Sequence, residues 1–313
     1  MGPVLTPRSL ILVHSEGWQD IRDFQRIKAH VEDIAPDVAV SIASNLLRNS
    51  HLRKAAARNP TLIFSPIRLQ KFRPVRGRLY VGQPCSKLDE MKALIARGMR
   101  VPKFEEITPD TALSEQDYGP YVIVKPSHAL ASWGIGVELL RTKDVRYRPP
   151  SAFPADHPGR LAPMIAQKFI DCGRAMNCRV LTLFGTPIFT YCRESTDALA
   201  LEGKEAPFRK RDFMPTPHNS VGYVTHDPDI LAFAGSAFQA VPQVALQACD
   251  ILRSKDGELY LLEINPGGGT WMFSNISAQA YKQRLGVDDL QDEFDAFRTC
   301  AKLLVDRTRV EAV

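Results

Sequence analysis

Two carboxylates and an amide could meet on one face of a hairpin in the last third of the chain. Asp256-Gly257 is a strong signal for a two-residue turn, with apolar and strand-forming residues on both sides. Counting outward from that turn pairs Asp250 with Glu263, and Asn265 then points to the same face as Glu263. Directly opposed carboxylates lie about 5 Å apart and repel each other. Three such oxygen donors predict a hard-cation site of the Mg²⁺ type.

A lysine at the end of an apolar strand begins a second candidate site. The strand at 121–124 leads into Lys125 and Ser127, then into a loop of small residues that includes Ser132 and Gly134, and then into a return strand. Glycines let backbone N–H groups approach phosphate oxygens, and a lysine adds a point charge. The pattern is not a P-loop, which needs G-x₄-G-K-[S/T] at the start of a helix. It indicates a flap over a phosphate or, for the lysine alone, a charge protecting a sheet edge.

Two arginines and a glycine run add candidates for anion binding. Arg179 lies inside the apolar strand 178–185, and Arg193 follows the strand 187–192. An arginine in such a place either reaches back to solvent or points at an anion. The run centred on Gly268 offers backbone N–H groups to an oxyanion or a substrate carboxylate, or is a plain turn.

The basic residues are unevenly spread, although the formal net charge is only +5. From 38 to 88 there is no Asp or Glu. The same span contains Arg48, Arg53, Lys54, Arg58, Arg68, Lys71, Arg73, Arg76, Arg78 and Lys87. It is either a solvated basic face or a docking surface for an anionic substrate, an acidic peptide or nucleic acid. Nucleic acid is the less favoured partner, because no aromatic interleaving or RNA-binding motif accompanies the charges.

Composition limits the cellular setting. The six cysteines form no C-x-x-C pair and no signal peptide is recognisable, which favours a reduced, cytoplasmic compartment. The most apolar stretch, 230–248, is interrupted by glutamines and a proline, so it is expected to be a buried helix and its exit, with no membrane span.

The first 85 residues alternate strands with helices, which is typical of an α/β lobe with a mainly parallel sheet. The expected strands are 10–14, 38–42 and 61–64, and the expected helices are 18–34 and 46–58. A helix at 87–98 opens a second unit, and a strand-rich third unit closed by helices follows. We therefore expect an N-terminal α/β domain at 1–85, a small subdomain with the flap at 86–165, and a C-terminal subdomain with the metal site at 166–313.

Taken in order, these segments resemble the ATP-grasp superfamily, in which an α/β domain precedes a nucleotide clamp of two α+β subdomains. The resemblance covers residues 87–270 and is carried by 122–127 with its glycine loop, by 167–170, and by the hairpin carboxylates with Asn265. The glycine loop is most similar to that of D-alanine–D-alanine ligases. Arg179, with the later Asn219-x-x-Gly222, is more similar to ligases that add glutamate to peptides and proteins.

The resemblance implies ATP and Mg²⁺ as cofactors, with Mn²⁺ able to substitute. The residues implied for the nucleotide are Lys87, Lys125, Ser127, Ser132, Gly134, Gln167, Lys168, Phe169, Ile170 and Asp171. Those implied for the metal are Asp250, Glu263 and Asn265, and those implied for catalysis are Arg179, Arg193 and Gly268. Gln167 departs from the glutamate of many relatives, and Asp171 is the expected ribose contact.

The implied reaction is ATP-dependent ligation of a carboxylate to an amine or thiol through an acyl phosphate. One alternative is a kinase of the same fold that phosphorylates a small-molecule hydroxyl. The other is a non-catalytic protein that binds a nucleotide or an anionic partner. The expected substrates are anionic small molecules or peptides, and dimers are common in the family, so a homodimer is a further expectation.

Overall fold

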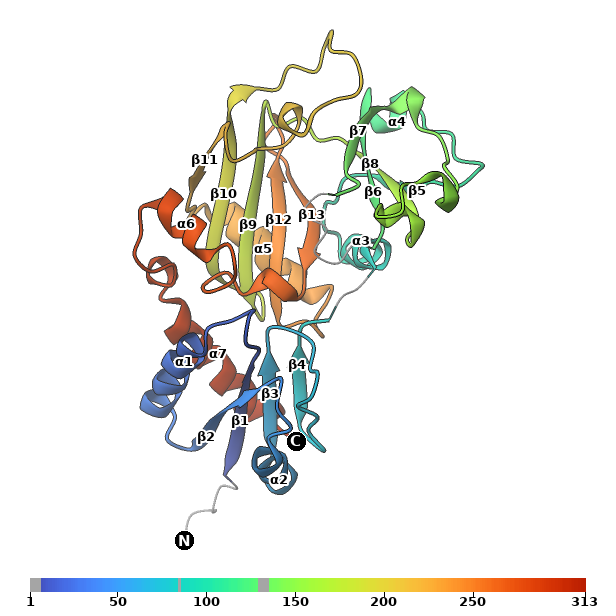
Figure 1. The fold of residues 1–313 in the computed structure, drawn as a ribbon. Coiled ribbons are helices and arrows are strands. Elements are labelled where there is room, and N and C mark those ends of the chain that lie inside the picture. Colours follow the sequence, from blue (N-terminus) through green and yellow to red (C-terminus); the bar gives the residue numbers. More distant parts are fainter. Residues whose placement is uncertain (1–6, 84–85, 129–134) are drawn as a thin grey trace.

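Three β-sheets organise the residues that the computed structural model describes, which are 7–83, 86–128 and 135–313 (Figure 1). The first sheet lies at the end of the molecule that holds both termini. The second and third lie side by side above it. The predicted fold class, a parallel α/β lobe followed by a two-part α+β clamp, is confirmed.

The first sheet is parallel and has the order β2-β1-β3-β4. Its strands are β1 (Arg8–His14), β2 (Val38–Ser44), β3 (Thr61–Ser65) and β4 (Arg78–Val81). Helix α1 (Ile21–Ile34) covers one face and α2 (Ser50–Arg58) the other. The strand β4 was not predicted, because its apolar run Leu79-Tyr80-Val81 is only three residues long and follows a stretch rich in arginine and proline.

The last helix, α7 (Ala296–Glu311), returns to the first sheet and packs beside α1. Its apolar residues recur at helical spacing, with Phe297, Ala301, Leu304 and Val305 all buried in the core shared with β1 and β3. The chain therefore closes on its own beginning, and the Thr61 N–H donates to the Val313 carbonyl at 3.1 Å.

The second sheet is antiparallel and has the order β5-β8-β6-β7. Its strands are β5 (Phe104–Glu106), β6 (Tyr121–Pro126), β7 (Glu138–Arg141) and β8 (Met164–Lys168), and it is flanked by α3 (Lys87–Ala96) and α4 (Glu115–Tyr118). Val122 and Val124 pack on one face with Phe153. Strand alternation therefore turns Lys125 and Gln167 to the opposite face.

The third sheet is antiparallel and has the order β11-β10-β9-β12-β13. Its strands are β9 (Arg174–Leu183), β10 (Thr186–Ala198), β11 (Ser220–Tyr223), β12 (Leu246–Arg253) and β13 (Leu259–Asn265), with α5 (Pro228–Ser236) and α6 (Ala278–Leu285) beside them. Short 3-10 helices lie at Thr142–Asp144, Pro150–Ala152, Pro158–Arg160, Lys210–Asp212, Ala237–Gln239, Gly268–Thr270 and Asp292–Phe294. Buried apolar residues of one face pack on α5, as Leu261 and Ile264 do.

The opposite face of the third sheet divides into two halves. Leu181 and Phe189 belong to the core that also contains α1 and α7, so this half rests on the N-terminal lobe. Towards the other end of the same strands the residues on this face become polar, beginning with Arg179 and Asp250. The candidate site lies on that polar half.

A glycine allows the first sheet to meet the loop after β13. A Cβ at Gly82 would lie 2.6 Å from the carbonyl oxygen of Pro266 and closer still to that of Pro66, a separation that real Cβ atoms do not show. Trp271, a few residues further on, is fully buried and donates from Nε1 to Asp23 of α1 at 2.8 Å. These contacts fix the end of β13 against the N-terminal lobe.

Cys178 and Cys192 lie opposite each other on β9 and β10 and are joined by a disulfide. Their separation in the sequence gave no reason to expect this pair, and the cytoplasmic compartment remains a prediction. None of the helices in the described ranges combines the length and apolar character needed to cross a membrane.

Candidate functional site

The turn between β12 and β13 is longer than predicted. The Ser254 N–H donates to the Glu258 carbonyl at 2.9 Å, so the loop contains the three residues 255–257. Gly257 has a φ of +86°, the left-handed conformation that closes loops of this kind. The predicted two-residue Asp-Gly turn is therefore wrong.

A β-bulge in the hairpin compensates for the longer turn and restores the predicted register beyond it. Ile251 pairs with Leu261, whereas the next pair outward is Asp250 with Glu263, so β13 carries one extra residue at this point. The predicted pairing of Asp250 with Glu263 is confirmed. The bulge also explains why Leu261 and Ile264 can both point to α5 although they are three residues apart.

The three predicted metal-binding side chains meet on the polar half of the sheet. The Asn265 side-chain N–H₂ donates to Asp250 Oδ2 at 3.2 Å and to Glu263 Oε1 at 3.5 Å. The side chain of Asp250 is 7% exposed and that of Glu263 is 23% exposed. The amide thus separates two carboxylates that would otherwise repel each other directly.

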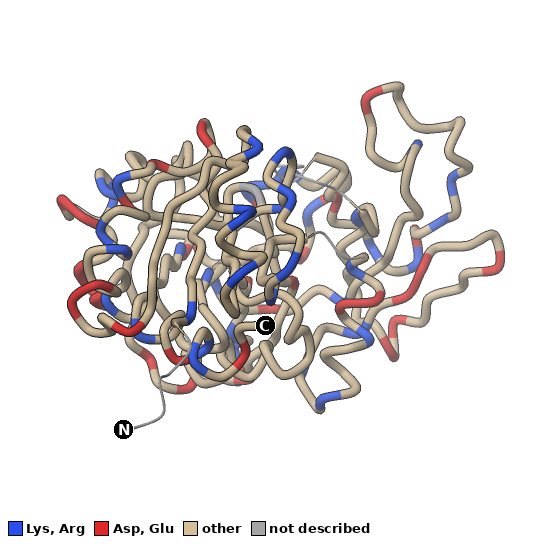
Figure 2. Tube along the Cα trace, turned by 90° about the horizontal axis from the view of Figure 1, so that it is seen from below, with Lys and Arg blue, Asp and Glu red and all other residues tan. Residues whose placement is uncertain are grey.

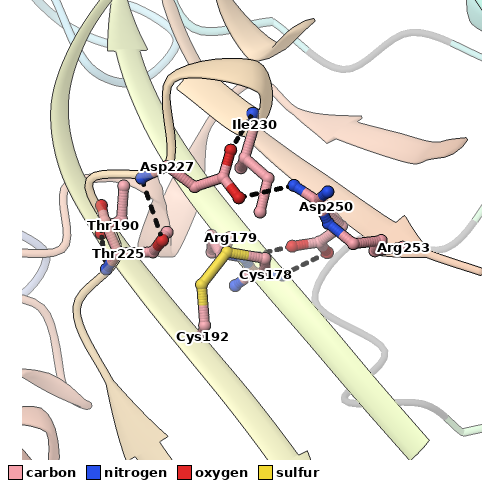
Figure 3. Close-up of a disulfide and its surroundings, with 9 residues drawn as sticks. All are labelled: Cys178, Arg179, Thr190, Cys192, Thr225, Asp227, Ile230, Asp250 and Arg253. Carbon is pink, nitrogen blue, oxygen red and sulfur yellow. Dashed lines mark hydrogen bonds and ion pairs between the residues drawn. A yellow bond between two sulfur atoms is a disulfide. The ribbon is translucent and has the colours of Figure 1, made fainter. Parts of the chain in front are cut away.

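Arg179 holds Asp250 from the neighbouring strand, as Figure 3 shows. Its Nε and Nη2 donate to the two carboxylate oxygens at 2.7 and 2.6 Å, a fork geometry that the direct β9–β12 pairing of the two residues makes available. Burial opposes the charged form of Arg179, but Asp250 outweighs it and raises the pKa of the guanidinium. The predicted anion-binding arginine therefore has a carboxylate partner within the site itself.

Two lysines approach Glu263 from the other side. Lys87, the first residue of α3, forms an ion pair with Glu263. Lys125, from the second sheet, is 7% exposed, and its ammonium group makes no hydrogen bond within the described parts of the chain. The site therefore places two ammonium groups beside one buried carboxylate.

The charges of this cluster shift one another's pKa values. Burial disfavours the ionised form of Glu263, but Lys87 and Lys125 outweigh it and hold its pKa at about 2. Burial, aided by repulsion from Lys87, lowers the pKa of Lys125 to about 8. Burial also opposes the charge on Lys87, yet Glu263 keeps its pKa raised. Lys125 is thus the least stabilised charge in the site.

The lowered pKa of Lys125 should make folding stability depend on alkaline pH. Between about 8 and the ordinary value of 10.5 the unfolded chain keeps the Lys125 proton that the folded chain has lost. The contribution of this group to the free energy of unfolding therefore rises with pH across that window, by on the order of 3 kcal/mol. Below about pH 8 the full cost of burying the charged lysine is present. Urea unfolding at about pH 7 and about pH 10 measures the difference between the native chain and Lys125→Met. If the free energy of unfolding changed equally with pH in both chains, the lowered pKa of Lys125 would be contradicted.

The donor set fits a hard divalent cation. Two carboxylates and a carboxamide supply oxygen ligands, and Mg²⁺ commonly takes one or two carboxylates and keeps several waters. Asp250 already accepts three hydrogen bonds, so about one of its four lone-pair directions remains open. The Asn265 amide faces the carboxylates with its N–H₂ group and would have to rotate to offer Oδ1. Within the described residues no group of three or more His, Cys, Asp or Glu forms a metal-binding cluster.

Glu90 is a site residue that the sequence alone did not reveal. Its side chain is buried, and its Oε1 accepts the backbone N–H of Ile264 at 2.6 Å, which fastens α3 to β13. The signal was present in the spacing, because Lys87 and Glu90 are one helical turn apart and share a face. Glu90 also helps to raise the pKa of Lys87.

The predicted hinge at 167–171 runs from β8 towards the third sheet. Gln167 is buried and its amide contacts the Met91 sulfur of α3 at 3.4 Å. The N–H groups of Lys168 and Phe169 are already bonded to carbonyls of Lys103 and Tyr121. A ligand at this edge would therefore use other backbone groups.

The remaining hinge residues differ in their surroundings. Ile170 is buried, and within the described residues its N–H has no hydrogen bond. Asp171 is exposed, accepts the Gly173 N–H at 2.9 Å and pairs with Lys255 of the β12–β13 loop at 3.0 Å. Asp171 thus joins the segment 167–171 to the hairpin that carries Asp250 and Glu263.

The other predicted residues lie at different distances from the cluster. Ser127 is buried and its carbonyl accepts the Lys87 N–H at 3.1 Å, so it belongs to the lysine side of the site. Arg193 pairs with Asn177 across β10 and β9, on the same face as Arg179. Gly268 begins the 3-10 turn after β13, and Ser132 and Gly134 lie outside the described residues.

Truncating the two site arginines should separate their structural roles. Arg179→Met leaves Asp250 buried without its bidentate partner, and we expect a loss of about 2 to 3 kcal/mol in the free energy of unfolding. Arg193→Met is the matched control, because Arg193 has no ion pair within the described residues and should lose less than about 0.5 kcal/mol. Urea denaturation of both variants is the measurement. Equal losses would show that Asp250 does not depend on Arg179.

Comparisons with known proteins identify solved structures that share the fold of this chain. No protein-family model and no curated protein matches the sequence. A structure of the ATP-grasp ligase PsnB complexed with a minimal precursor superposes with a TM-score of 0.53 at 15% identity, covering 95% of this chain and 99% of that one. A second PsnB structure, with a phosphomimetic precursor variant, Mg and ADP, gives a TM-score of 0.51 at 14% identity, covering 97% of this chain and 99% of that chain.

Two further structures agree with this result. D-cycloserine synthetase DcsG gives a TM-score of 0.53 at 15% identity, covering 96% of this chain and 99% of that chain. A RiPP-associated ATP-grasp ligase from Chryseobacterium gregarium, in complex with ADP and a leader and core peptide, gives a TM-score of 0.53 at 13% identity, covering 96% of this chain and 97% of that chain. The identities are low, so the likeness concerns the fold. This chain has the ATP-grasp fold.

Proposed function

We propose that this protein is an ATP-dependent ligase that joins a carboxylate to an amine through an acyl phosphate. The observation that carries the proposal is Lys125, a buried ammonium group beside Lys87 that has no hydrogen-bond partner within the described residues. Burial and repulsion from Lys87 disfavour the Lys125 charge, and Glu263 offsets them only in part, so a further anion beside the two lysines would stabilise them. A polyphosphate supplies that anion, and two of the similar structures contain ADP.

The nucleotide would lie between the second and third sheets. Lys87 and Lys125 would bind its phosphates, with Ser127 and the flap that follows it closing over them. The adenine would meet the hinge at Gln167 and at the N–H of Ile170, next to Lys168 and Phe169. Asp171 is the candidate for the ribose. Asp250, Glu263 and Asn265 would hold Mg²⁺, with Mn²⁺ as a substitute, and the ion would supply positive charge to neutralise the phosphates.

The reaction would proceed in two displacements. A carboxylate oxygen attacks the γ-phosphorus while the bond to the β–γ bridging oxygen breaks, and ADP leaves with that electron pair. The amine nitrogen then attacks the acyl carbon, the carbon–oxygen bond to phosphate breaks, and the amine proton leaves with the phosphate.

Several groups of the chain could stabilise the developing charges. Arg179 uses Nε and Nη2 for Asp250, which leaves Nη1 free within the described residues to donate to the transferring phosphoryl group. Arg193 and the backbone N–H groups around Gly268 would be candidates for the tetrahedral oxyanion. A well-placed donor of this kind contributes about 3 to 4 kcal/mol to the transition state.

The experiment begins with titration calorimetry of ATP into the native chain with and without Mg²⁺. The proposal expects binding that strengthens when Mg²⁺ is present. Acidic peptides and small carboxylates are then offered with MgATP and hydroxylamine, which captures an acyl phosphate as a hydroxamate. Hydroxamate and free phosphate in equal amounts support ligation. A stable phosphorylated product would instead establish the kinase chemistry, and absence of nucleotide binding would refute the proposal.

A further inference from the structure

The acid-free span of the sequence folds into one face of the N-terminal sheet. Helix α2 and the crossover 66–77, which joins β3 to β4, cover the same side of that sheet. Leu52 and Ala56 of α2 pack with Phe72 of the crossover against Ile63 of β3. The polar residues between these buried positions therefore lie on the outer side of these elements, where all the basic ones are exposed except Arg53, which is half-buried.

Two cations of the span leave this surface. Arg78 turns to the opposite face, where it contacts Tyr80 and pairs with Glu311 of α7, and Lys87 pairs with Glu263. The rest form what we call the α2 basic surface, made of Arg48, Arg53, Lys54, Arg58, Arg68, Lys71, Arg73 and Arg76. None of its members has an ion pair with any residue in the described ranges. Figure 2, seen from below, shows basic segments gathered beside the C-terminus.

The side chains among these cations favour a polypeptide partner. The phenylalanine and tyrosine residues of the span, Phe64, Phe72 and Tyr80, are all buried, so none offers a ring for base stacking. Aliphatic side chains are exposed instead, with Leu47 at 60% and Val75 at 71%. Cations interspersed with exposed aliphatic groups complement a peptide that carries both acidic and apolar residues.

The upper end of the α2 basic surface adjoins the candidate site. Asn45, which follows β2, accepts the N–H of Gln70 and donates to the carbonyl of Arg68, and it holds the crossover at the end of the sheet. At this same edge Pro66 and Gly82 meet Pro266, the residue directly after Asn265. A chain bound along the surface therefore has a short path to the metal-binding hairpin.

We propose that the α2 basic surface binds an acidic segment of a polypeptide substrate and delivers a carboxylate of that polypeptide to the site. The proposal rests on the ligase function proposed above and names the substrate class for it. The acidic segment neutralises cations that lack partners in the chain, and its attraction should weaken as salt screens the charges.

Fluorescence anisotropy on the full chain tests the proposal with a labelled peptide of glutamate residues interspersed with leucine. The test variant is Lys54→Glu/Lys71→Glu. The control is Lys143→Glu/Lys302→Glu, which makes the same change in net charge at exposed lysines elsewhere, one of them on α7. We expect the test variant to bind the peptide about tenfold more weakly or worse, and the control to stay within about twofold of the native chain.

Two results would overturn the assignment. One is equal binding of the peptide by test and control variants, with circular dichroism showing both folded. The other is tighter binding of a labelled single-stranded oligonucleotide than of the peptide at the same salt, lost in the test variant. MgATP titrated into the same variants should bind equally. Failure to bind MgATP with peptide binding intact would refute the ligase function and leave the surface assigned.

Discussion

Lys125→Met is expected to weaken MgATP binding by about two to three orders of magnitude and to stabilise the ligand-free protein. The ammonium group is buried beside Lys87, and Glu263 offsets burial and repulsion only in part, so a bound anion would relieve the remaining cost. Removing one partner of a buried charge pair costs about 2 to 5 kcal/mol of binding. In the ligand-free protein, removing this charge abolishes both the cost of burying the ammonium group and its repulsion from Lys87. In Lys125→Met the MgATP affinity measured by calorimetry should therefore fall, while the Tm of the ligand-free protein should rise.

A proton-linked signal distinguishes this electrostatic role from packing. The pKa of Lys125 is lowered to about 8 in the ligand-free chain, and bound phosphates would raise it again. At about pH 8.5 the binding of MgATP should take up a proton, and the measured heat should change with the ionisation enthalpy of the buffer. Lys143→Met, an exposed lysine of the same subdomain, is the control and should behave as native. Undiminished affinity in Lys125→Met would remove Lys125 from the phosphate site.

The carboxylate hairpin was predictable because its information is local. Glycine in the turn, apolar alternation and two acidic residues in matching positions lie within a single short segment. Even there the turn length was wrong, and the pairing of Asp250 with Glu263 survived because a bulge restored the register. Register in a hairpin is set by the buried face as much as by the turn, since a slip would expose Leu261 and Ile264.

The partners of these carboxylates could not be predicted, because they come from distant segments. Arg179 meets Asp250 only because β9 lies between β10 and β12, a strand order that no local pattern records. Lys87 reaches Glu263 from a helix far earlier in the chain. The return of α7 to the first sheet is likewise a consequence of packing. The helical spacing of its apolar residues predicts a buried face but does not say which element covers that face.

Glu263→Gln is expected to lower turnover by about two to three orders of magnitude and to remove its dependence on Mg²⁺. The substitution keeps the shape of the side chain but replaces an anionic ligand with a neutral one, and the metal supplies several kcal/mol of charge stabilisation. Phosphate release across a series of Mg²⁺ concentrations is the measurement. Glu258→Gln, in the same hairpin but exposed, is the control and should keep the native response. Normal Mg²⁺-dependent turnover in Glu263→Gln would refute the metal assignment.

The same substitution should also destabilise the ligand-free fold, because Glu263 is the carboxylate that offsets both lysines. In Glu263→Gln the two ammonium groups keep only the weaker attraction of Glu90 and Asp250, and we expect a loss of about 3 kcal/mol in the free energy of unfolding. Adding Lys125→Met removes one of the repelling charges, so the double variant should recover most of that loss. A coupling energy near zero in this cycle would mean that Lys125 and Glu263 do not interact. A large coupling would show that Glu263 offsets the charge of Lys125 in the ligand-free fold.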